Sequence, residues 1–207
     1  MTLNVLYCFD SGYDQQAQCS IYSLLQNVSE AINISIIHKN HGDEKFLNKK
    51  ILGHQNLKEL KVNKFSNKNI KFPNLHGAHI SEATYYRIYL ETYINSEIDF
   101  LLYIDADIIC FSDPIIEIQN QIKTLKDSEF ILSAKTETTL KDGVNRIGLS
   151  SDRYFNAGVL LINYQLWITK KSTDGLTNLL FSDIPKLDYW DQDLLNIYFD
   201  NAFDEMN

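Results

Sequence analysis

Cysteine, proline and glycine are all scarce in this 207-residue chain, which holds 3, 3 and 8 of them respectively. The cysteines (Cys8, Cys19 and Cys110) are widely spaced and form no CxxC motif, which argues against a disulfide framework and a zinc site. No stretch reaches the ~18 consecutive apolar residues of a membrane-spanning helix. The start, MTLNVLYCFD, has no basic segment before its apolar residues, so no signal peptide is expected. These absences predict a cytoplasmic protein.

Positive charge is also short, because 19 lysines and arginines face 27 acidic residues and leave a net charge of −8. A nucleic-acid partner is therefore not expected, since such partners require a basic face. The 44% of hydrophobic residues is typical of a globular protein, and the length is sufficient for one complete core. No internal repeat or linker interrupts the chain, so we expect a single domain over residues 1–207.

Short β-branched runs alternate with amphipathic helical patterns along the chain. The patterns predict strands at 3–9, 33–38, 100–104, 130–134 and 158–163, and helices at 14–28, 80–95 and 191–199. This alternation predicts an α/β fold with a mostly parallel sheet between helices. Two further segments, 66–79 and 136–154, are expected to be loops over a site, because loops this long are usually functional or disordered.

Two carboxylates interrupt an apolar run at residues 101–110, LLYIDADIIC. Asp105 and Asp107 follow the strand predicted to end near Ile104, at the sheet edge where α/β proteins bind ligands. In extended chain they would point the same way, and two oxygen ligands suit Mg²⁺ or Mn²⁺. One alternative is a simple turn, since Asp113-Pro114 follows closely. Another is a phosphatase of the haloacid dehalogenase type, which the mid-chain position of the motif disfavours.

A single arginine lies in the helical pattern HISEATYYRIYLETYI at 79–94. Apolar residues cover nearly the whole of this helix, so it should be buried, and Arg87 with it. A buried guanidinium keeps its proton and therefore needs an anion. The partner could be a carboxylate, such as Asp105 or Glu82, or a phosphate of a ligand.

Five stretches together resemble glycosyltransferase family 8, most nearly the bacterial lipo-oligosaccharide and lipopolysaccharide galactosyl- and glucosyltransferases. The stretches, in family order, are FDSGYDQQAQCSIYSLL (9–25), HISEATYYRIYL (79–90), LLYIDADIIC (101–110), YFNAGVLLINYQLW (154–167) and DYWDQDLLN (188–196). The resemblance implies a Rossmann-like nucleotide-diphospho-sugar transferase fold. It also implies retaining transfer of a hexose from UDP-galactose or UDP-glucose to a glycan or lipid-linked glycan acceptor.

The resemblance also implies roles for residues that bind the donor and a metal. Asp10 and Tyr13 would contact the uracil at the end of the first strand. Asp105 and Asp107 would bind Mn²⁺, or Mg²⁺ in its place, which bridges to the diphosphate. Arg87 would meet the donor sugar or a phosphate.

A second set, Asn156, Asp191 and Gln192, would form the catalytic centre around the transferred sugar, and His79 would lie near the acceptor. Gln192 is a weak nucleophile, so front-face reaction and double displacement both remain open. Each residue also has a structural alternative. Asp191 could cap a helix, Asn156 could lie in a turn, Tyr13 could be core and His79 could start a helix.

The family's C-terminal segment, with a metal-binding histidine and a diphosphate-binding lysine, has no counterpart here. All five histidines, at 38, 41, 54, 76 and 79, precede the Asp-Ala-Asp motif. The C-terminal part of the family fold is therefore expected to be missing. A second hypothesis follows, a non-catalytic UDP-sugar-binding or partner module.

Apolar surface that the missing C-terminal segment would cover is expected to be exposed and to favour self-association. Peripheral attachment at the inner membrane through the acceptor is a further expectation.

Overall fold

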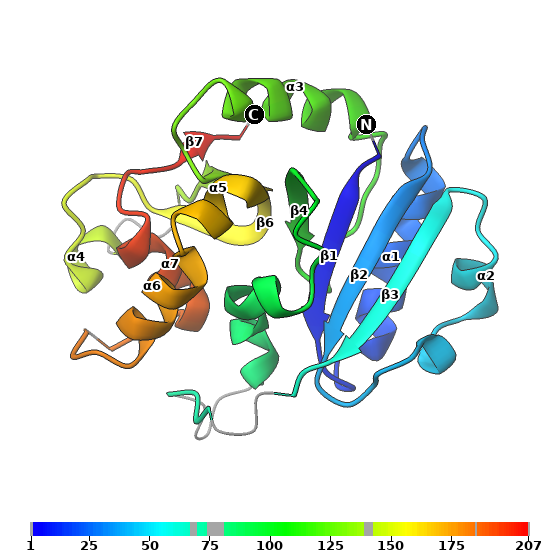
Figure 1. Cartoon of the computed structure of the whole chain (residues 1–207), viewed down its shortest axis with the longest axis horizontal. Coiled ribbons are helices and arrows are strands. Elements are labelled where there is room, and N and C mark those ends of the chain that lie inside the picture. The colour runs from blue at the N-terminus through cyan, green and yellow to red at the C-terminus, as the bar shows by residue number, and fades with distance from the viewer. Residues whose placement is uncertain (1, 67–69, 74–80, 139–142, 185, 207) are drawn as a thin grey trace.

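A twisted sheet with helices on both faces forms the centre of the molecule (Figure 1). The computed structural model describes residues 2–66, 70–73, 81–138, 143–184 and 186–206. The strands are β1 (Asn4–Phe9), β2 (Ile32–His38), β3 (Leu57–Lys64), β4 (Phe100–Ile104), β5 (Leu132–Thr136), β6 (Phe155–Asn163) and β7 (Asp204–Glu205). The helices are α1 (Asp14–Asn27), η1 (Glu44–Phe46), α2 (Lys49–Leu52), η2 (Glu82–Thr92), α3 (Ile115–Lys126), α4 (Gly143–Ile147), α5 (Tyr164–Thr169), α6 (Ser172–Leu180) and α7 (Trp190–Tyr198).

The strand order within the described residues is β3-β2-β1-β4-β6-β5-β7. Strands β3, β2, β1 and β4 run parallel, β6 is antiparallel to both its neighbours, and β7 is parallel to β5. The expected mostly parallel α/β sheet is therefore confirmed. From β1 the chain builds β2 and β3 on one side and then returns to place β4 on the other. Ligands of α/β proteins bind at such a switch point, outside the carboxyl ends of the strands.

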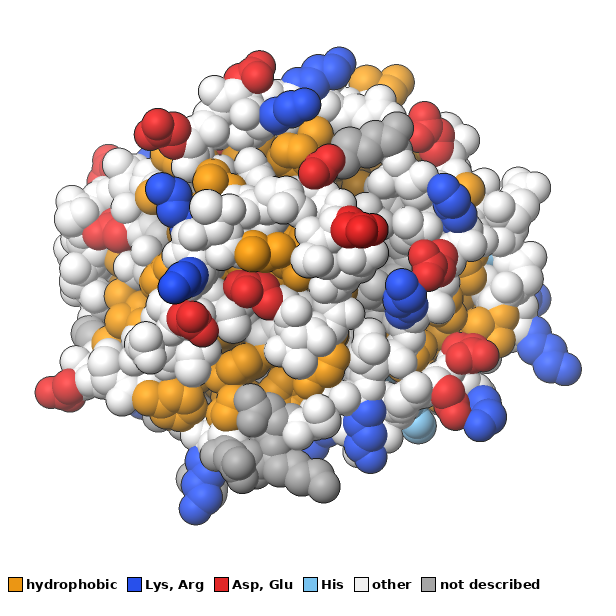
Figure 2. All heavy atoms as spheres, viewed as in Figure 1, with side chains coloured by type: hydrophobic (Ala, Val, Ile, Leu, Met, Phe, Trp, Pro, Cys, Tyr) orange, Lys and Arg blue, Asp and Glu red, His pale blue; other side chains and the backbone are white. Residues whose placement is uncertain are grey.

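The alternation of side chains along β1 divides the core between the two faces of the sheet. Leu6 and Cys8 contribute to one apolar cluster, with residues of η2, α5, α6 and α7. Val5, Tyr7 and Phe9 contribute to the other, with residues of α1, α2 and α3. On the face of the molecule in Figure 2, acidic and basic side chains are interspersed and not gathered by sign.

The strands expected from the sequence lie within three residues of the observed bounds, but several elements were not predicted. The pattern LKELKVNK of β3 was missed because its lysines hide the apolar alternation; β3 lies at the edge of the sheet, where lysines are common. Helices α3, α5 and α6 and strand β7 were also missed. The segment 136–154 is not a single loop, since it contains the end of β5 and helix α4.

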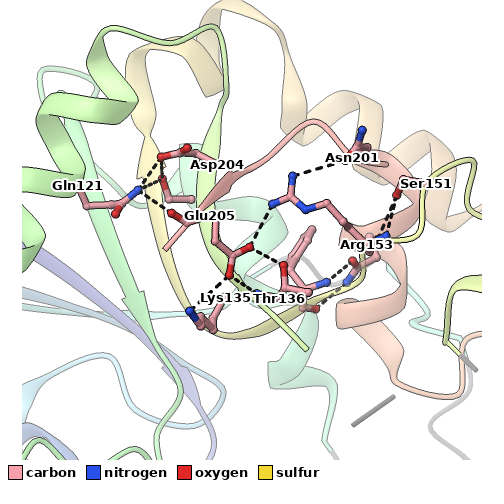
Figure 3. A network of polar contacts seen from close by, with 11 residues as sticks. Gln121, Lys135, Thr136, Ser151, Arg153, Asn201, Asp204 and Glu205 are labelled. Carbon is pink, nitrogen blue, oxygen red and sulfur yellow. Dashed lines mark hydrogen bonds and ion pairs between the residues drawn. The ribbon is translucent and has the colours of Figure 1, made fainter. Parts of the chain in front are cut away.

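A polar network joins strand β7 to α3, to the end of β5 and to the residues just before β6 (Figure 3). Glu205 accepts hydrogen bonds from the Thr136 hydroxyl and backbone and from the Arg153 guanidinium, the last at 3.1 Å. The Arg153 guanidinium also lies 3.9 Å from the centroid of the Phe203 ring. Gln121 on α3 donates to Asp204 at 2.6 Å. The network therefore fixes the backbone just before Tyr154, which contributes to the site described below.

Helices α6 and α7 approach each other closely at Gly175. A Cβ at this position would lie 2.5 Å from the Tyr198 hydroxyl oxygen. Gly175→Ala should therefore lower the free energy of unfolding by about 1–3 kcal/mol, despite the higher helix propensity of alanine. Urea denaturation followed by circular dichroism measures this change. In a Tyr198→Ala background the same substitution should be neutral or stabilising, and an equal loss in both backgrounds would contradict the explanation.

Candidate functional site

A cavity of about 260 Å³ opens at the carboxyl ends of β1 and β4, at the switch point of the sheet. Its walls come from β1, η2, the turn after β4, β6 and α7. The polar and aromatic side chains that line it are Phe9, Asp10, Tyr13, Ser81, Thr84, Arg87, Tyr103, Asp105, Asp107, Tyr189, Trp190, Asp191 and Gln192. Residues predicted from four separate stretches of sequence thus meet at one place.

Asp105 and Asp107 lie in a tight turn directly after β4. The backbone N–H of Ile108 donates to the Asp105 carbonyl at 3.2 Å, and the Asp105 N–H donates to the Gly158 carbonyl of β6 at 2.8 Å. The expectation of an extended chain with both carboxylates on one side was therefore wrong, because the strand ends at Ile104. The turn nevertheless brings both residues to the cavity, with Asp105 partly buried and Asp107 exposed.

Arg87 is buried, as expected, with only 6% of its side chain exposed. Its Nη2 donates to Asp105 Oδ1 at 2.7 Å, its Nη1 donates to the Ala157 carbonyl, and its guanidinium lies 3.8 Å from the Tyr103 ring centroid. Burial opposes the charge, but Asp191 and Asp105 raise the pKa of Arg87 above its ordinary value. Of the two carboxylates considered from the sequence, Asp105 is the partner.

The helix that carries Arg87 differs from the expectation. The described part, η2, is a 3-10 helix with non-helical dihedral angles at Tyr89, and Ser81 caps its start by accepting from the Ala83 N–H at 3.1 Å. The prediction of a regular α-helix over residues 80–95 was therefore wrong. Glu82 instead accepts a hydrogen bond from the Tyr86 hydroxyl at 2.6 Å.

Asp191 is the second carboxylate at Arg87, and it is 4% exposed. Its Oδ2 lies 2.8 Å from Arg87 Nε, although this N–H is poorly aligned with it, and its Oδ1 accepts from the Thr84 hydroxyl. Burial raises the pKa of Asp191 to about 6, although Arg87 and Thr84 both lower it. The helix-cap alternative is wrong, because Tyr189 occupies the N-cap of α7.

The residue before Asp191, Trp190, has a φ of 43°. This left-handed conformation is uncommon for a bulky side chain, and such strained positions concentrate at functional sites. It turns the chain at the start of α7 so that Asp191 is buried toward Arg87. No sequence signal identified this feature.

Gln192 and Asn156 accept hydrogen bonds from the backbone at the start of β6, next to the cavity. Gln192 Oε1 accepts from the Ala157 N–H at 3.0 Å, and Asn156 Oδ1 accepts from the Gly158 N–H at 2.8 Å. Asn156 is an exposed residue within β6, so the turn alternative was wrong. A Cβ at Gly158 would lie 3.0 Å from Asn156 Oδ1 and 3.1 Å from Asp105 Oδ2, so glycine keeps these oxygens close together.

Asp10 and Tyr13 line the cavity just after the end of β1. Asp10 Oδ1 accepts from the Gly12 N–H at 2.8 Å, and the Asp10 carbonyl accepts from the Tyr13 N–H at 2.9 Å, which closes a turn. The core alternative for Tyr13 was wrong, because 37% of this residue is exposed. His79 lies outside the described residues.

Among the side chains of the site that the sequence analysis missed, Tyr103 and Thr84 contact its carboxylates directly. The Tyr103 hydroxyl donates to Asp105 Oδ1 at 2.6 Å. Tyr103 was classified only as an apolar strand residue, yet its place two residues before Asp105 is a usable signal, because alternate strand residues share a face. Thr84 carries no comparable signal.

The charged residues that line the cavity are Asp10, Asp105, Asp107 and Asp191 against Arg87, so four negative charges and one positive give −3. An anionic ligand would be repelled by this surface unless a cation accompanied it. Asp105 and Asp107 supply hard oxygen ligands at the exposed edge. These residues therefore fit a divalent cation that is bound together with an anion.

Asp14, His38 and His41 form another cluster with potential metal ligands within 4.8 Å of one another. His38 Nδ1 accepts from the backbone N–H groups of Asn40 and His41, at 2.9 and 2.8 Å. In the neutral ring Nε2 therefore carries the proton and donates to Asp14 at 3.0 Å. Burial lowers the pKa of His38, which favours this neutral form. The cluster is a hydrogen-bonded support for α1 and does not fit a metal bound at His38 Nε2.

Comparison with known proteins identifies relatives over most of the chain. The model of Glycosyl transferase family 8 matches residues 4–207. A putative glycosyltransferase of Haemophilus influenzae is 30% identical over 205 residues, which cover 94% of this chain and 58% of that protein. A lipopolysaccharide 1,2-glucosyltransferase of Escherichia coli is 32% identical over 124 residues, or 56% of this chain and 35% of that protein. The chain thus spans about a third to three fifths of the length of these relatives.

The fold is shared with a solved galactosyltransferase. The crystal structure of LgtC in complex with donor and acceptor sugar analogues superposes with a TM-score of 0.71 at 22% identity. The match covers 98% of this chain and 73% of that one. The expected nucleotide-diphospho-sugar transferase fold is therefore confirmed. Among the described residues, no helix combines the length and the apolar character needed to cross a membrane.

Proposed function

Because this chain belongs to glycosyltransferase family 8, we propose that it transfers glucose or galactose from a UDP-sugar to a glycan acceptor, with retention at the anomeric carbon. One observation carries the proposal: Arg87 joins Asp105 and Asp191 across the cavity at the carboxyl ends of β1 and β4. Three stretches that resemble the family thereby converge on one ligand-sized space. The donor identity and the stereochemistry rest on the resemblance.

The nucleoside would bind at the end of β1. The Tyr13 ring is exposed there and offers a face on which uracil can stack. The Gly12 N–H fixes one carboxylate oxygen of Asp10, and the other would accept the N–H of the uracil ring. The position of both residues at the cavity wall, with Tyr13 exposed and Asp10 half-buried, supports this placement.

The diphosphate would bind beside Asp105 and Asp107 together with Mn²⁺ or Mg²⁺. When bound, the metal would neutralise charge on the UDP leaving group. Arg87 and Tyr103 hold Asp105 in one orientation, while the exposed Asp107 completes the pair of carboxylates. The net negative charge of the cavity supports a need for this cation.

The transferred sugar would lie between Arg87 and the start of α7. Asp191 and Asn156 would accept hydrogen bonds from its hydroxyl groups. The Gln192 carboxamide is a weak nucleophile, so its oxygen would stabilise the positive charge that develops on the sugar ring in the transition state. Galactose and glucose differ at one hydroxyl, and relatives of this chain are described with either sugar.

The acceptor would be a bacterial surface glycan, by analogy with the lipopolysaccharide glucosyltransferase to which the chain is similar. His79 would lie near this acceptor. Synthesis would take place in the cytoplasm, with the acceptor bringing the protein to the inner membrane. Self-association stays a prediction, for which the 88% exposed Phe111 and the 66% exposed Ile116 are the natural surface.

The proposal is tested by incubating the chain with UDP-galactose or UDP-glucose and Mn²⁺, and measuring release of UDP. We expect slow hydrolysis of one donor in preference to the other, which stops when EDTA removes the metal. A glycan acceptor should accelerate UDP release. Binding of UDP without any turnover of either donor would instead support a non-catalytic module.

A further inference from the structure

A buried carboxylate behind the cavity, Asp193, is held by four donors. Its side chain is fully buried on α7. Arg146 of α4 donates to both oxygens, at 2.8 and 2.6 Å, the Tyr154 hydroxyl donates at 2.7 Å and the Tyr189 N–H at 2.8 Å. Such a bidentate pair with a guanidinium fixes the plane of the Asp193 carboxylate.

The carboxylate determines the direction of the Tyr154 hydroxyl. Both oxygens of Asp193 face the donors of the Arg146 guanidinium and act as acceptors, so the single proton of Tyr154 points toward Asp193. Tyr154 is 2% exposed, and burial together with Asp193 raises the pKa of its hydroxyl well above the ordinary value. Toward any third group, the oxygen of Tyr154 can therefore only accept a hydrogen bond.

That third group is the Gln192 carboxamide, whose Nε2 lies 3.1 Å from the Tyr154 oxygen. Because this oxygen must accept, the NH₂ end of Gln192 must face it. At the other end, Oε1 lies 3.0 Å from the Ala157 N–H, which can only donate. Two independent constraints thus give the same orientation of the amide.

The orientation matters because the two ends of the amide face different surroundings. Gln192 and Ala157 line the cavity, whereas Tyr154 does not. The oxygen, which is the negative end of the amide dipole, is therefore on the cavity side, and the NH₂ group points into the protein. A reversed amide would place positive charge where a sugar with cationic character reacts.

We propose that Arg146, Asp193 and Tyr154 are positioning residues that lock the Gln192 carboxamide with its oxygen toward the transferring sugar. The proposal rests on the proposed function for its catalytic consequence. None of the three lines the cavity; they reach it through the contact of Tyr154 with Gln192 and of Asp193 with the Tyr189 N–H. The three residues come from separate parts of the chain: Arg146 from α4, Tyr154 from the segment just before β6, and Asp193 from α7.

The test is Tyr154→Phe, which removes the acceptor for Gln192 Nε2 and keeps the ring. We expect kcat for donor turnover to fall by about 10- to 100-fold, the order lost when a reacting group is misplaced. The Kd for UDP should stay within about twofold, because the nucleotide site is untouched. The matched control is Tyr164→Phe, which removes another hydroxyl of a fully buried tyrosine, hydrogen-bonded to the Ile94 carbonyl at 3.2 Å. It should leave kcat unchanged.

Arg146 supplies a second variant that does not touch Gln192 or Tyr154. Arg146→Met should lower kcat with little change in Kd for UDP, and Arg146→Lys should restore part of the loss. Unchanged kcat in Tyr154→Phe would overturn the proposal. So would equal losses in Tyr154→Phe and Tyr164→Phe, since both would then reflect stability alone.

A readout without turnover separates this proposal from the proposed function. The side-chain NH₂ protons of Gln192 can be followed by NMR, with Gln192→Glu identifying their signals. In Tyr154→Phe their exchange with solvent should accelerate by about tenfold or more, as expected when a hydrogen bond is lost. Unchanged exchange would show that Tyr154 does not hold the amide, even if the wild-type chain turns over no donor.

Discussion

Replacing Arg87 with methionine should lower the free energy of unfolding by about 3–5 kcal/mol, because it leaves the buried carboxylate of Asp191 without its cation. Only 6% of each of the two side chains is exposed, so water cannot replace the guanidinium. Methionine keeps the length and the apolar contacts of the side chain. Urea denaturation monitored by circular dichroism measures the loss.

The matched control is Arg153→Met, which breaks a pair with Glu205 in which the side chains are 32% and 40% exposed. Exposed ion pairs contribute about 0–1 kcal/mol, so this variant should be much less affected. Equal losses in the two variants would contradict the assignment of Arg87 as the central buried cation.

The Arg87→Met deficit should also depend on pH. In the wild type, burial raises the pKa of Asp191 to about 6, above its unfolded value of 3.8. The stability linked to this proton is therefore fully present below the unfolded pKa and is lost as pH rises through 6. Without the guanidinium the pKa of Asp191 should rise further. As the pH is lowered, protonation of Asp191 should therefore begin to stabilise the variant at a higher pH than it does the wild type. Its deficit should be smaller at pH 6 than at pH 8.

Replacing Asp107 with asparagine should reduce metal-dependent donor turnover by at least about 100-fold, since it removes one of two charged ligands from the cation that neutralises the leaving group. Asp107 is exposed, so the thermal midpoint should barely change. Asp183→Asn removes the same charge from an exposed position outside the cavity lining and should leave turnover intact. Initial rates of UDP release over a range of Mn²⁺ concentrations measure both variants. A similar decrease for Asp183→Asn would indicate a general effect of charge.

The sequence was most informative where local pattern and fold agree. The apolar run before Asp105 predicted both the strand and its end at Ile104, because a central strand reads as a continuous hydrophobic segment. The apolar residues on nearly all sides of the predicted helix indicated that Arg87 is buried. The structure confirms this burial, even though η2 is a 3-10 helix. Burial depends on the surrounding residues more than on the helix type.

Long-range pairing was not accessible in the same way. The contact between Arg87 and Asp191 joins residues 104 positions apart, which no local period records. The left-handed backbone at Trp190 is imposed by the tertiary structure against the preference of the side chain. The Arg146–Asp193 pair likewise lies in segments expected to be a loop and a simple helix.

The most direct test of the account is titration calorimetry of UDP into the chain, with and without Mn²⁺, repeated with Asp107→Asn. The account predicts binding that requires the metal and is abolished by the substitution, because the net negative cavity admits a diphosphate only with a cation. Equal binding with and without Mn²⁺, or full binding by Asp107→Asn, would contradict a metal–diphosphate site at Asp105 and Asp107.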